Sequence, residues 1–291
     1  MTRYEDRFWS SRDGLKLHYR DYAGRADLGL YAPPPIVCLH GLTRNARDFE
    51  PLAERLSPDW RVLCPEMRGR GESEYAREAA SYNPLQYVED VTALLDEQGI
   101  DRFVSVGTSL GGLMTMLMAL QNPERIAAAV INDVGPYLEP AGLERIKDYV
   151  GQGRSFPTWV HAARGLEEMH GAAHPNRDLP FWIAAAKRVM TLSSNARIVF
   201  DYDMKIAEPF AQLDPAAAQA DMWPALEALR GKPVLIVRGA LSDLLSTQTL
   251  AKMLERLPEA EAVTIPDVGH APTLCEPEAF AAIDRLLARI G

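Results

Sequence analysis

The sequence predicts an α/β protein with a mostly parallel central sheet flanked by helices. Short β-branched apolar runs alternate with longer segments rich in Ala, Leu and Met, as in strands joined by crossover helices. With 291 residues and 47% hydrophobic content, the chain can bury one large core. The alternation stops between residues 135 and 221. We therefore expect a core of residues 1–134 and 222–291, with 135–221 as a helical cap (lid) insertion.

The first half of the chain supplies a hairpin followed by strands and helices in turn. Two short segments joined through Arg12-Asp13-Gly14 predict an opening antiparallel hairpin. Short apolar runs then predict buried strands, and longer amphipathic runs predict helices. The hairpin strands are 7–11 and 15–22, the later strands 36–39, 61–64, 103–106 and 126–132, and the helices 48–56 and 83–98.

The second half contains the insertion and then a return to the strand pattern. The sequence predicts that the insertion is helical, because it contains no convincing buried strand. The Ala run at Ala216 to Ala218 predicts the start of a helix that continues toward Asp221. The other helices expected in the insertion are 143–150, 158–169 and 180–190. Strands at 233–238 and 262–265 follow, with helices at 247–257 and 277–290.

A Gly-x-Ser-x-Gly pattern lies where the strand at 103–106 meets an apolar helix. Gly107 and Gly111 flank Ser109, which lets the backbone turn sharply and present the hydroxyl above the sheet. Small residues around a serine also occur in turns that only connect two buried elements. The strand before and the helix after favour the other interpretation, in which Ser109 is a nucleophile.

A serine nucleophile requires a base and a carboxylate that orients the base. His270 is the predicted base, because it lies in a Gly- and Pro-containing loop after the last strand. Asp243 is the predicted acid, since it follows the strand at 233–238. Asp133, after the strand at 126–132, is the alternative, and Asp267 ranks third. Packed, hydrogen-bonding or solvated roles are expected for His18, His40, His161, His170 and His174.

Two backbone amides are candidates for the oxyanion hole, which stabilises the charge that develops on an attacked carbonyl. One is the N–H of Leu110, directly after the nucleophile. The other is the N–H of Leu42, in the His40-Gly41-Leu42 loop that follows the strand at 36–39. The sequence therefore predicts acyl transfer with Leu42 and Leu110 around the oxyanion.

These motifs together resemble the α/β-hydrolase superfamily over nearly the whole chain. The matching segments are LHGLTRN (39–45), PEMRGRGES (65–73), GTSLGG (107–112), RGALSD (238–243) and VGH (268–270). The second departs from the family pattern, because Glu66 stands where Asp is commoner; in the family this loop is structural. The resemblance is strongest to small carboxylesterases, lactonases and ring-cleavage-product hydrolases with helical caps.

The resemblance implies a serine hydrolase that cleaves carboxylic esters of small to medium apolar acyl groups through an acyl-enzyme. Related epoxide hydrolases and haloalkane dehalogenases carry Asp at the nucleophile position of this turn, where the present sequence has Ser109. The alternatives are a carbon–carbon hydrolase or enol-lactonase of aromatic degradation, and a non-catalytic ligand-binding receptor. A dicarboxylate-like substrate would need cations at the pocket, for which the candidates are Arg44, Arg47, Arg164 and Arg188.

Composition limits the partners that we expect. Trp159, Trp182 and Arg44 are predicted to contact a small-molecule ester substrate. The net charge of -9 and the lack of a basic run argue against nucleic acid. No signal peptide and no apolar run of about 20 residues is apparent, so we expect a cytoplasmic protein without a membrane partner. We expect no cofactor and no metal, and a homo-oligomer is compatible with the sequence.

Overall fold

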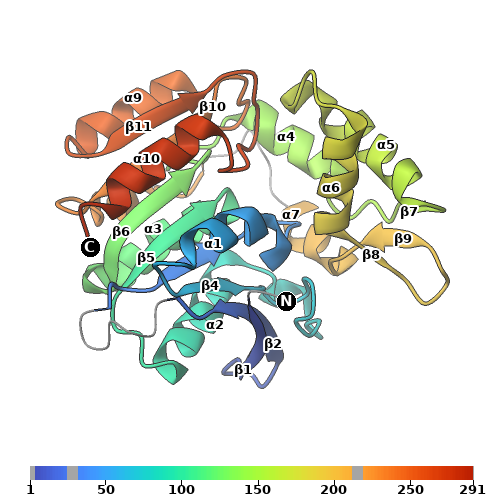
Figure 1. Ribbon diagram of the computed structural model, residues 1–291, viewed down its shortest axis with the longest axis horizontal. Helices are drawn as coiled ribbons and strands as arrows, with labels where there is room; N and C mark the ends of the chain where they lie inside the picture. The colour runs from blue at the N-terminus through green and yellow to red at the C-terminus, as the bar shows by residue number, and fades with distance from the viewer. Residues whose placement is uncertain (1–3, 25–31, 212–218, 291) are drawn as a thin grey trace.

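An eight-stranded sheet forms the centre of the molecule in the computed structural model, which describes residues 4–24, 32–211 and 219–290 (Figure 1). The strands are β1 (Glu5–Ser10), β2 (Lys16–Tyr22), β3 (Ile36–Leu39), β4 (Val62–Pro65), β5 (Phe103–Thr108), β6 (Ile126–Asn132), β10 (Val234–Gly239) and β11 (Glu261–Ile265). Their order is β1-β2-β4-β3-β5-β6-β10-β11. Only β2 pairs antiparallel with its neighbours, β1 and β4. The predicted hairpin and mostly parallel sheet are confirmed.

Helices cover both faces of this sheet, as the alternating pattern predicts. One face packs against α1 (Glu50–Leu56) and α10 (Pro277–Leu287). The other packs against α2 (Pro84–Glu97), α3 (Leu110–Gln121), α8 (Trp223–Glu227) and α9 (Thr247–Arg256). Strands β3, β4 and β6 are buried along their whole length, which explains their uninterrupted apolar sequences. No helix of the described residues is long and apolar enough to cross a membrane.

The segment between β6 and α8 lies beyond the carboxyl ends of the parallel strands (Figure 1). Its helices are α4 (Pro140–Tyr149), α5 (Trp159–His170), α6 (Leu179–Val189) and α7 (Ala207–Ala211). A small sheet of order β7-β9-β8 accompanies them, formed by β7 (Ser155–Phe156), β8 (Met190–Leu192) and β9 (Ile198–Phe200). This segment therefore contains a small sheet beside its helices, and none of the three strands is buried along its whole length. Strands of two or three residues are too short to show a period of two.

The cap segment, residues 135–221, has a hydrophobic cluster of its own. This cluster joins α5, α6 and the small sheet through Leu166, Trp182, Val189 and Ile198. The division into core and cap domains stays a prediction. The helix predicted to start at Ala216 to Ala218 lies outside the described residues. Short 3-10 turns connect several elements: Ala46–Phe49, Ala79–Ser81, Pro123–Arg125, Gly171–Ala173 and Met204–Ile206.

Candidate active site

Ser109 occupies a strained turn between β5 and α3. Its backbone has φ 53° and ψ −114°, a conformation that non-glycine residues rarely adopt. A Cβ on Gly107 would lie 2.3 Å from the carbonyl oxygen of Gly111, and a Cβ on Gly111 would lie 1.9 Å from that of Leu39. The Ser109 N–H donates to the Asn132 carbonyl at 2.9 Å. Both flanking glycines are therefore sterically required, and the turn is tied to the neighbouring strand β6.

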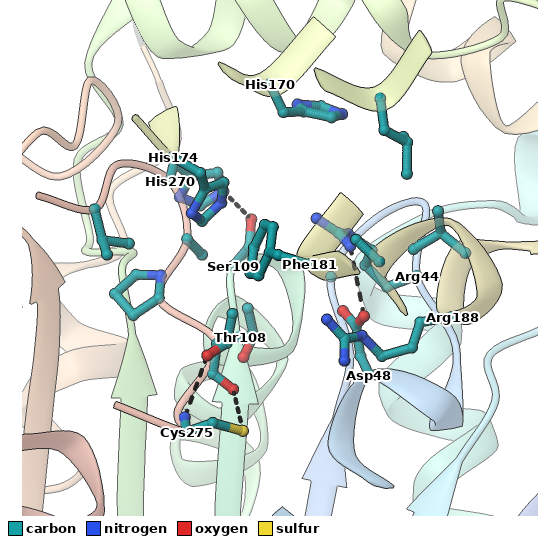
Figure 2. A pocket seen from close by; sticks show the side chains of 18 of the residues that line it. Arg44, Asp48, Thr108, Ser109, His170, His174, Phe181, Arg188, His270 and Cys275 are labelled. Carbon is teal, nitrogen blue, oxygen red and sulfur yellow. Dashed lines mark hydrogen bonds and ion pairs between the residues drawn. The ribbon is translucent and has the colours of Figure 1, made fainter. Parts of the chain in front are cut away.

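A continuous hydrogen-bonded chain leads from Ser109 to a carboxylate. His270 Nε2 lies 2.9 Å from Ser109 Oγ, and a dashed line marks this contact in the close-up of the cavity (Figure 2). On the other side of the ring, His270 Nδ1 lies 2.8 Å from Asp133 Oδ2. The side chains of His270 and Asp133 are 7% and 0% exposed. In this arrangement the imidazole can accept the serine proton while the carboxylate fixes its tautomer.

The structure does not place Asp243 against His270, so the preferred prediction for the third residue is wrong. Asp243 accepts hydrogen bonds from Arg145, at 2.5 Å from Nε and 2.8 Å from Nη2. Burial raises the pKa of Asp243, but its hydrogen bonds and ion pair with Arg145 leave that pKa below the ordinary value. Arg145 belongs to α4, so Asp243 links the core to the cap segment. The alternative residue, Asp133, holds the histidine.

Asp133 is surrounded by donors from the strand and loop of β10. Its Oδ1 accepts the Gly239 N–H at 2.8 Å, and its Oδ2 accepts the Ser242 hydroxyl at 2.7 Å. With His270, the carboxylate has three partners, which fix its orientation. Ser242 was missed in the sequence, because a serine in a turn carries no distinctive signal beside the more conspicuous Asp243.

A buried arginine holds the His40-Gly41-Leu42 loop, which is predicted to donate one N–H to the oxyanion. The Leu42 carbonyl accepts from Arg70 Nε at 3.0 Å and Nη2 at 2.9 Å, and Arg70 is 0% exposed. This clamp orients the peptide groups of the loop. Leu110 is the first residue of α3, so its N–H has no partner within the helix. Sequence reasoning missed Arg70, although it lies in the Gly-rich motif of residues 65–73.

His40 has a structural position in the same loop, as predicted. Its Nε2 accepts the Met67 N–H at 3.0 Å, and its Nδ1 lies 2.8 Å from the Gly41 carbonyl oxygen. Burial, and then the charge of Arg70, lowers the pKa of His40 to about 4. The ring is therefore neutral near pH 7 and joins the loop after β3 to the loop after β4.

Glu66, the departure from the family pattern, serves the structural role expected for that loop. Its carboxylate accepts the N–H groups of Ala46 at 3.1 Å and Glu72 at 2.8 Å, and it lies 2.8 Å from His18 Nδ1. A Cβ on Gly71 would fall 2.1 Å from Glu66 Oε2. The longer acidic side chain thus fits because a glycine packs directly on its carboxylate.

A cavity of about 560 Å³ opens above Ser109 and His270. The cap segment contributes an aromatic wall: Phe181, Trp182, Phe200 and Tyr202. Trp182 thus lies at the cavity, and its contact with a substrate stays a prediction. Trp159 does not line it but packs in the cap cluster, because the start of α5 faces α6.

Two cap histidines also line the cavity, although packed or solvated roles were expected for them. Burial, and after it the charge of Arg44, lowers the pKa of His170 to about 3 and that of His174 to about 4. Both rings are therefore neutral near pH 7. His174 is 7% exposed, and its Nδ1 has no hydrogen-bond partner among the described residues. The spacing of Leu166 and His170, four residues apart on α5, could have indicated that they share the cavity-facing side.

Of the four arginines considered for an anionic substrate, two reach the cavity. Arg44 and Arg188 line it, and Arg177 joins them. Arg47 instead binds Asp201, and Arg164 binds Glu167 on the surface of α5.

Comparison with known proteins identifies the family. The family model described as alpha/beta hydrolase fold matches residues 34–277. The chain belongs to the α/β-hydrolase family. Its fold agrees with a crystal structure of an α/β hydrolase from Novosphingobium aromaticivorans, with 60% identity, a TM-score of 0.94 and full coverage of both chains.

Similar sequences carry several hydrolase activities. The chain is 37% identical over 254 residues to a 3-hydroxybutyrate-oligomer hydrolase of Cupriavidus necator, which covers 86% of each protein. It is 28% identical over 246 residues to a 2-(acetamidomethylene)succinate hydrolase of Mesorhizobium japonicum, which covers 84% of each. These similarities show that the chain is a hydrolase of the α/β-hydrolase family.

Proposed function

We propose that this protein is a serine hydrolase that cleaves carboxylic esters of short hydroxyacyl chains through an acyl-enzyme. The observation that carries the proposal is the chain of hydrogen bonds from Ser109 through His270 to Asp133, at 2.9 and 2.8 Å. Serine, histidine and a carboxylate in this arrangement form the constellation that activates a hydroxyl for attack on a carbonyl.

In the proposed reaction, His270 Nε2 takes the proton of Ser109 as its Oγ attacks the ester carbonyl. The amides of Leu42 and Leu110 stabilise the oxyanion of the tetrahedral intermediate. Collapse breaks the bond to the leaving oxygen, to which His270 returns the proton, and the acyl group stays on Ser109. A water that gives its proton to His270 then attacks the acyl-enzyme. The bond to Ser109 Oγ breaks, His270 returns the proton to Oγ, and the acid is released. Asp133 stabilises the imidazolium in both steps.

The proposed substrate class draws on the relative and on the cavity. The Cupriavidus necator relative, at 37% identity, is named for hydrolysis of 3-hydroxybutyrate oligomers. Such oligomers have short branched units joined by esters, and the volume of about 560 Å³ lies within the range of small-molecule sites. Aromatic cap residues supply apolar contacts, while the neutral rings of His170 and His174 supply hydrogen-bonding groups for polar oxygens.

Hydrolysis of p-nitrophenyl butyrate and of the linear 3-hydroxybutyrate dimer by wild type and Ser109→Ala tests this proposal. We expect wild-type turnover of both, and a loss of at least about 10³-fold in kcat for the variant. A fluorophosphonate probe should label Ser109, as located by peptide mass spectrometry. Absence of turnover of both esters, or equal rates in the two proteins, would refute the proposal.

The arginines at the cavity favour a second candidate, the cleavage of a carbon–carbon bond in a dicarboxylate-like substrate. Arg44, Arg177 and Arg188 line the cavity, and anionic groups of such substrates need cations. A vinylogous diketone carboxylate, followed by the loss of its visible absorbance, tests this candidate. Faster turnover of the diketone than of the dimer would replace the first proposal by the second.

A further inference from the structure

Two guanidinium groups lie at one side of the active-site cavity with one carboxylate beside them. Arg44 and Arg188 both line the cavity, as does Asp48 (Figure 2). Arg44 Nη1 lies 3.4 Å from Asp48 Oδ1, which is long for a hydrogen bond between charged groups. The Arg188 guanidinium has no hydrogen bond or ion pair with any described residue. This side of the cavity therefore has more cationic than anionic groups.

The arginines that join the cap to the core are paired much more closely. Arg145 makes two short contacts with Asp243, and Arg47 Nη2 lies 2.5 Å from Asp201 Oδ2. Arg47 Nε also donates to the backbone carbonyl of Arg188 at 2.9 Å. This contact fixes the end of α6 while leaving the side chain of Arg188 unpaired. The backbone of Arg188 is thus held in place, while its side chain has no anionic partner in the described part of the chain.

Positive charge acts on the polar groups inside the cavity. After burial, Arg44 is the largest influence that lowers the pKa values of His170 and His174. The same potential, which disfavours a proton on these rings, favours an anion between the walls. Burial disfavours a charge of either sign in the cavity, and the charge of Arg44 adds to that cost for a cation and offsets part of it for an anion.

Among the residues that the structure describes, three acidic ones also line the cavity, and none of them forms an ion pair with Arg188. The carboxylate of Asp48 forms its ion pair with Arg44. Glu276 Oε1 accepts both the N–H and the hydroxyl of Thr273 at 2.9 Å, which directs it to its own loop. Glu278 is exposed at the start of α10. The unpaired guanidinium therefore remains available to a ligand.

We propose that Arg188, with Arg44 beside it, binds a free carboxylate of the substrate. The substrate is then an ester of a hydroxy acid with an anionic end, whose carbonyl reaches Ser109 while its carboxylate reaches Arg188. This inference rests on the proposed function and narrows its substrate class. The planar fork of a guanidinium suits carboxylates, with which it forms paired hydrogen bonds.

The test compares the linear 3-hydroxybutyrate dimer with its methyl ester, which has the same internal ester bond and no charge. Chromatography follows cleavage of that bond by wild type, Arg188→Gln, Arg44→Gln and Arg188→Lys. Arg164→Gln is the matched control, since Arg164 is a cap arginine paired with Glu167 outside the cavity. Circular dichroism melting checks that each variant is folded.

We expect wild type to prefer the free acid over the methyl ester in kcat/KM. Arg188→Gln should lower this preference about tenfold or more, chiefly through a higher KM for the acid. Arg44→Gln should lower it less, Arg188→Lys should restore part of it, and Arg164→Gln should match wild type. The same preference in wild type and in both glutamine variants would overturn the subsite. If wild type cleaves neither the dimer, its methyl ester nor p-nitrophenyl butyrate, the proposed function itself fails.

Discussion

The loops that follow β6 and β10 start from similar positions and end in different environments. Both continue buried parallel strands at the same edge of the sheet, and both carry an aspartate. The Asp133 side chain is 0% exposed and contacts His270, whereas the Asp243 side chain is 35% exposed and contacts Arg145. Position at the carboxyl edge of the sheet therefore does not decide whether an aspartate contacts His270; the donors that surround its side chain do.

The donors around the two carboxylates explain why they are not interchangeable. Asp133 is held by a backbone N–H and a hydroxyl in addition to His270, so its geometry is fixed within the core. Asp243 is held by a guanidinium from the cap segment. The loop after β10 still serves the site, but it does so through Ser242, the residue before Asp243.

The largest expected effect separates the two aspartates directly. Asp133→Asn should lower kcat for p-nitrophenyl butyrate by about 10⁴-fold, because an amide cannot maintain the same histidine tautomer or stabilise the imidazolium. Asp243→Asn should change kcat by no more than about threefold, since it breaks only one ion pair. Steady-state kinetics on folded variants measures both, and a reversed ranking would restore Asp243 as the acid.

A smaller effect tests the contribution of the β10 loop. Ser242→Ala removes the hydroxyl that donates to Asp133 at 2.7 Å, and should lower kcat by about three- to tenfold. The matched control is Ser246→Ala in the same loop region, because Ser246 caps α9 through Thr249. If the two alanine variants have the same kcat, the hydroxyl does not help to position the carboxylate.

The smallest expected effect concerns stability. Asp243→Asn should lower the free energy of unfolding at pH 7 by about 1 kcal/mol or less, because solvent screens this partly exposed pair. Since the folded-state pKa of Asp243 lies below its ordinary value of 3.8, its stabilising effect is present above that pH. The effect is lost as the pH falls through the lower folded-state pKa.

Urea unfolding of wild type and Asp243→Asn between pH 7 and pH 3 measures this difference. The control is Asp284→Asn, which breaks the exposed ion pair between Arg55 on α1 and Asp284 on α10. A gap between wild type and Asp243→Asn that widens toward acid would contradict the assignment of Asp243 as a charged structural partner.

The sequence by itself determined the Gly-x-Ser-x-Gly turn at Ser109, the position of His270 after the last strand and the mostly parallel sheet with its opening hairpin. These features depend on local constraints: Gly107 and Gly111 are needed where the chain nearly touches itself, and apolar runs of strand length must be buried. The Ser109–His270 contact followed because both residues come after parallel strands, whose carboxyl ends share one edge.

Only the tertiary structure decided the carboxylate and the cavity wall. Asp133 and Asp243 each follow a buried parallel strand, so the strand pattern does not distinguish them. The local sequence does not show that Asp133 adopts a positive φ of 55°. It also does not show that Asp243 pairs with Arg145, which lies 98 residues earlier in the chain. The same holds for His174 and Arg188, which reach the cavity because the cap segment lies above Ser109. The direction in which a loop side chain points depends on charged groups and hydrogen-bond donors from segments that are distant in the sequence. The hydrophobic periodicity of the sequence does not reveal these partners.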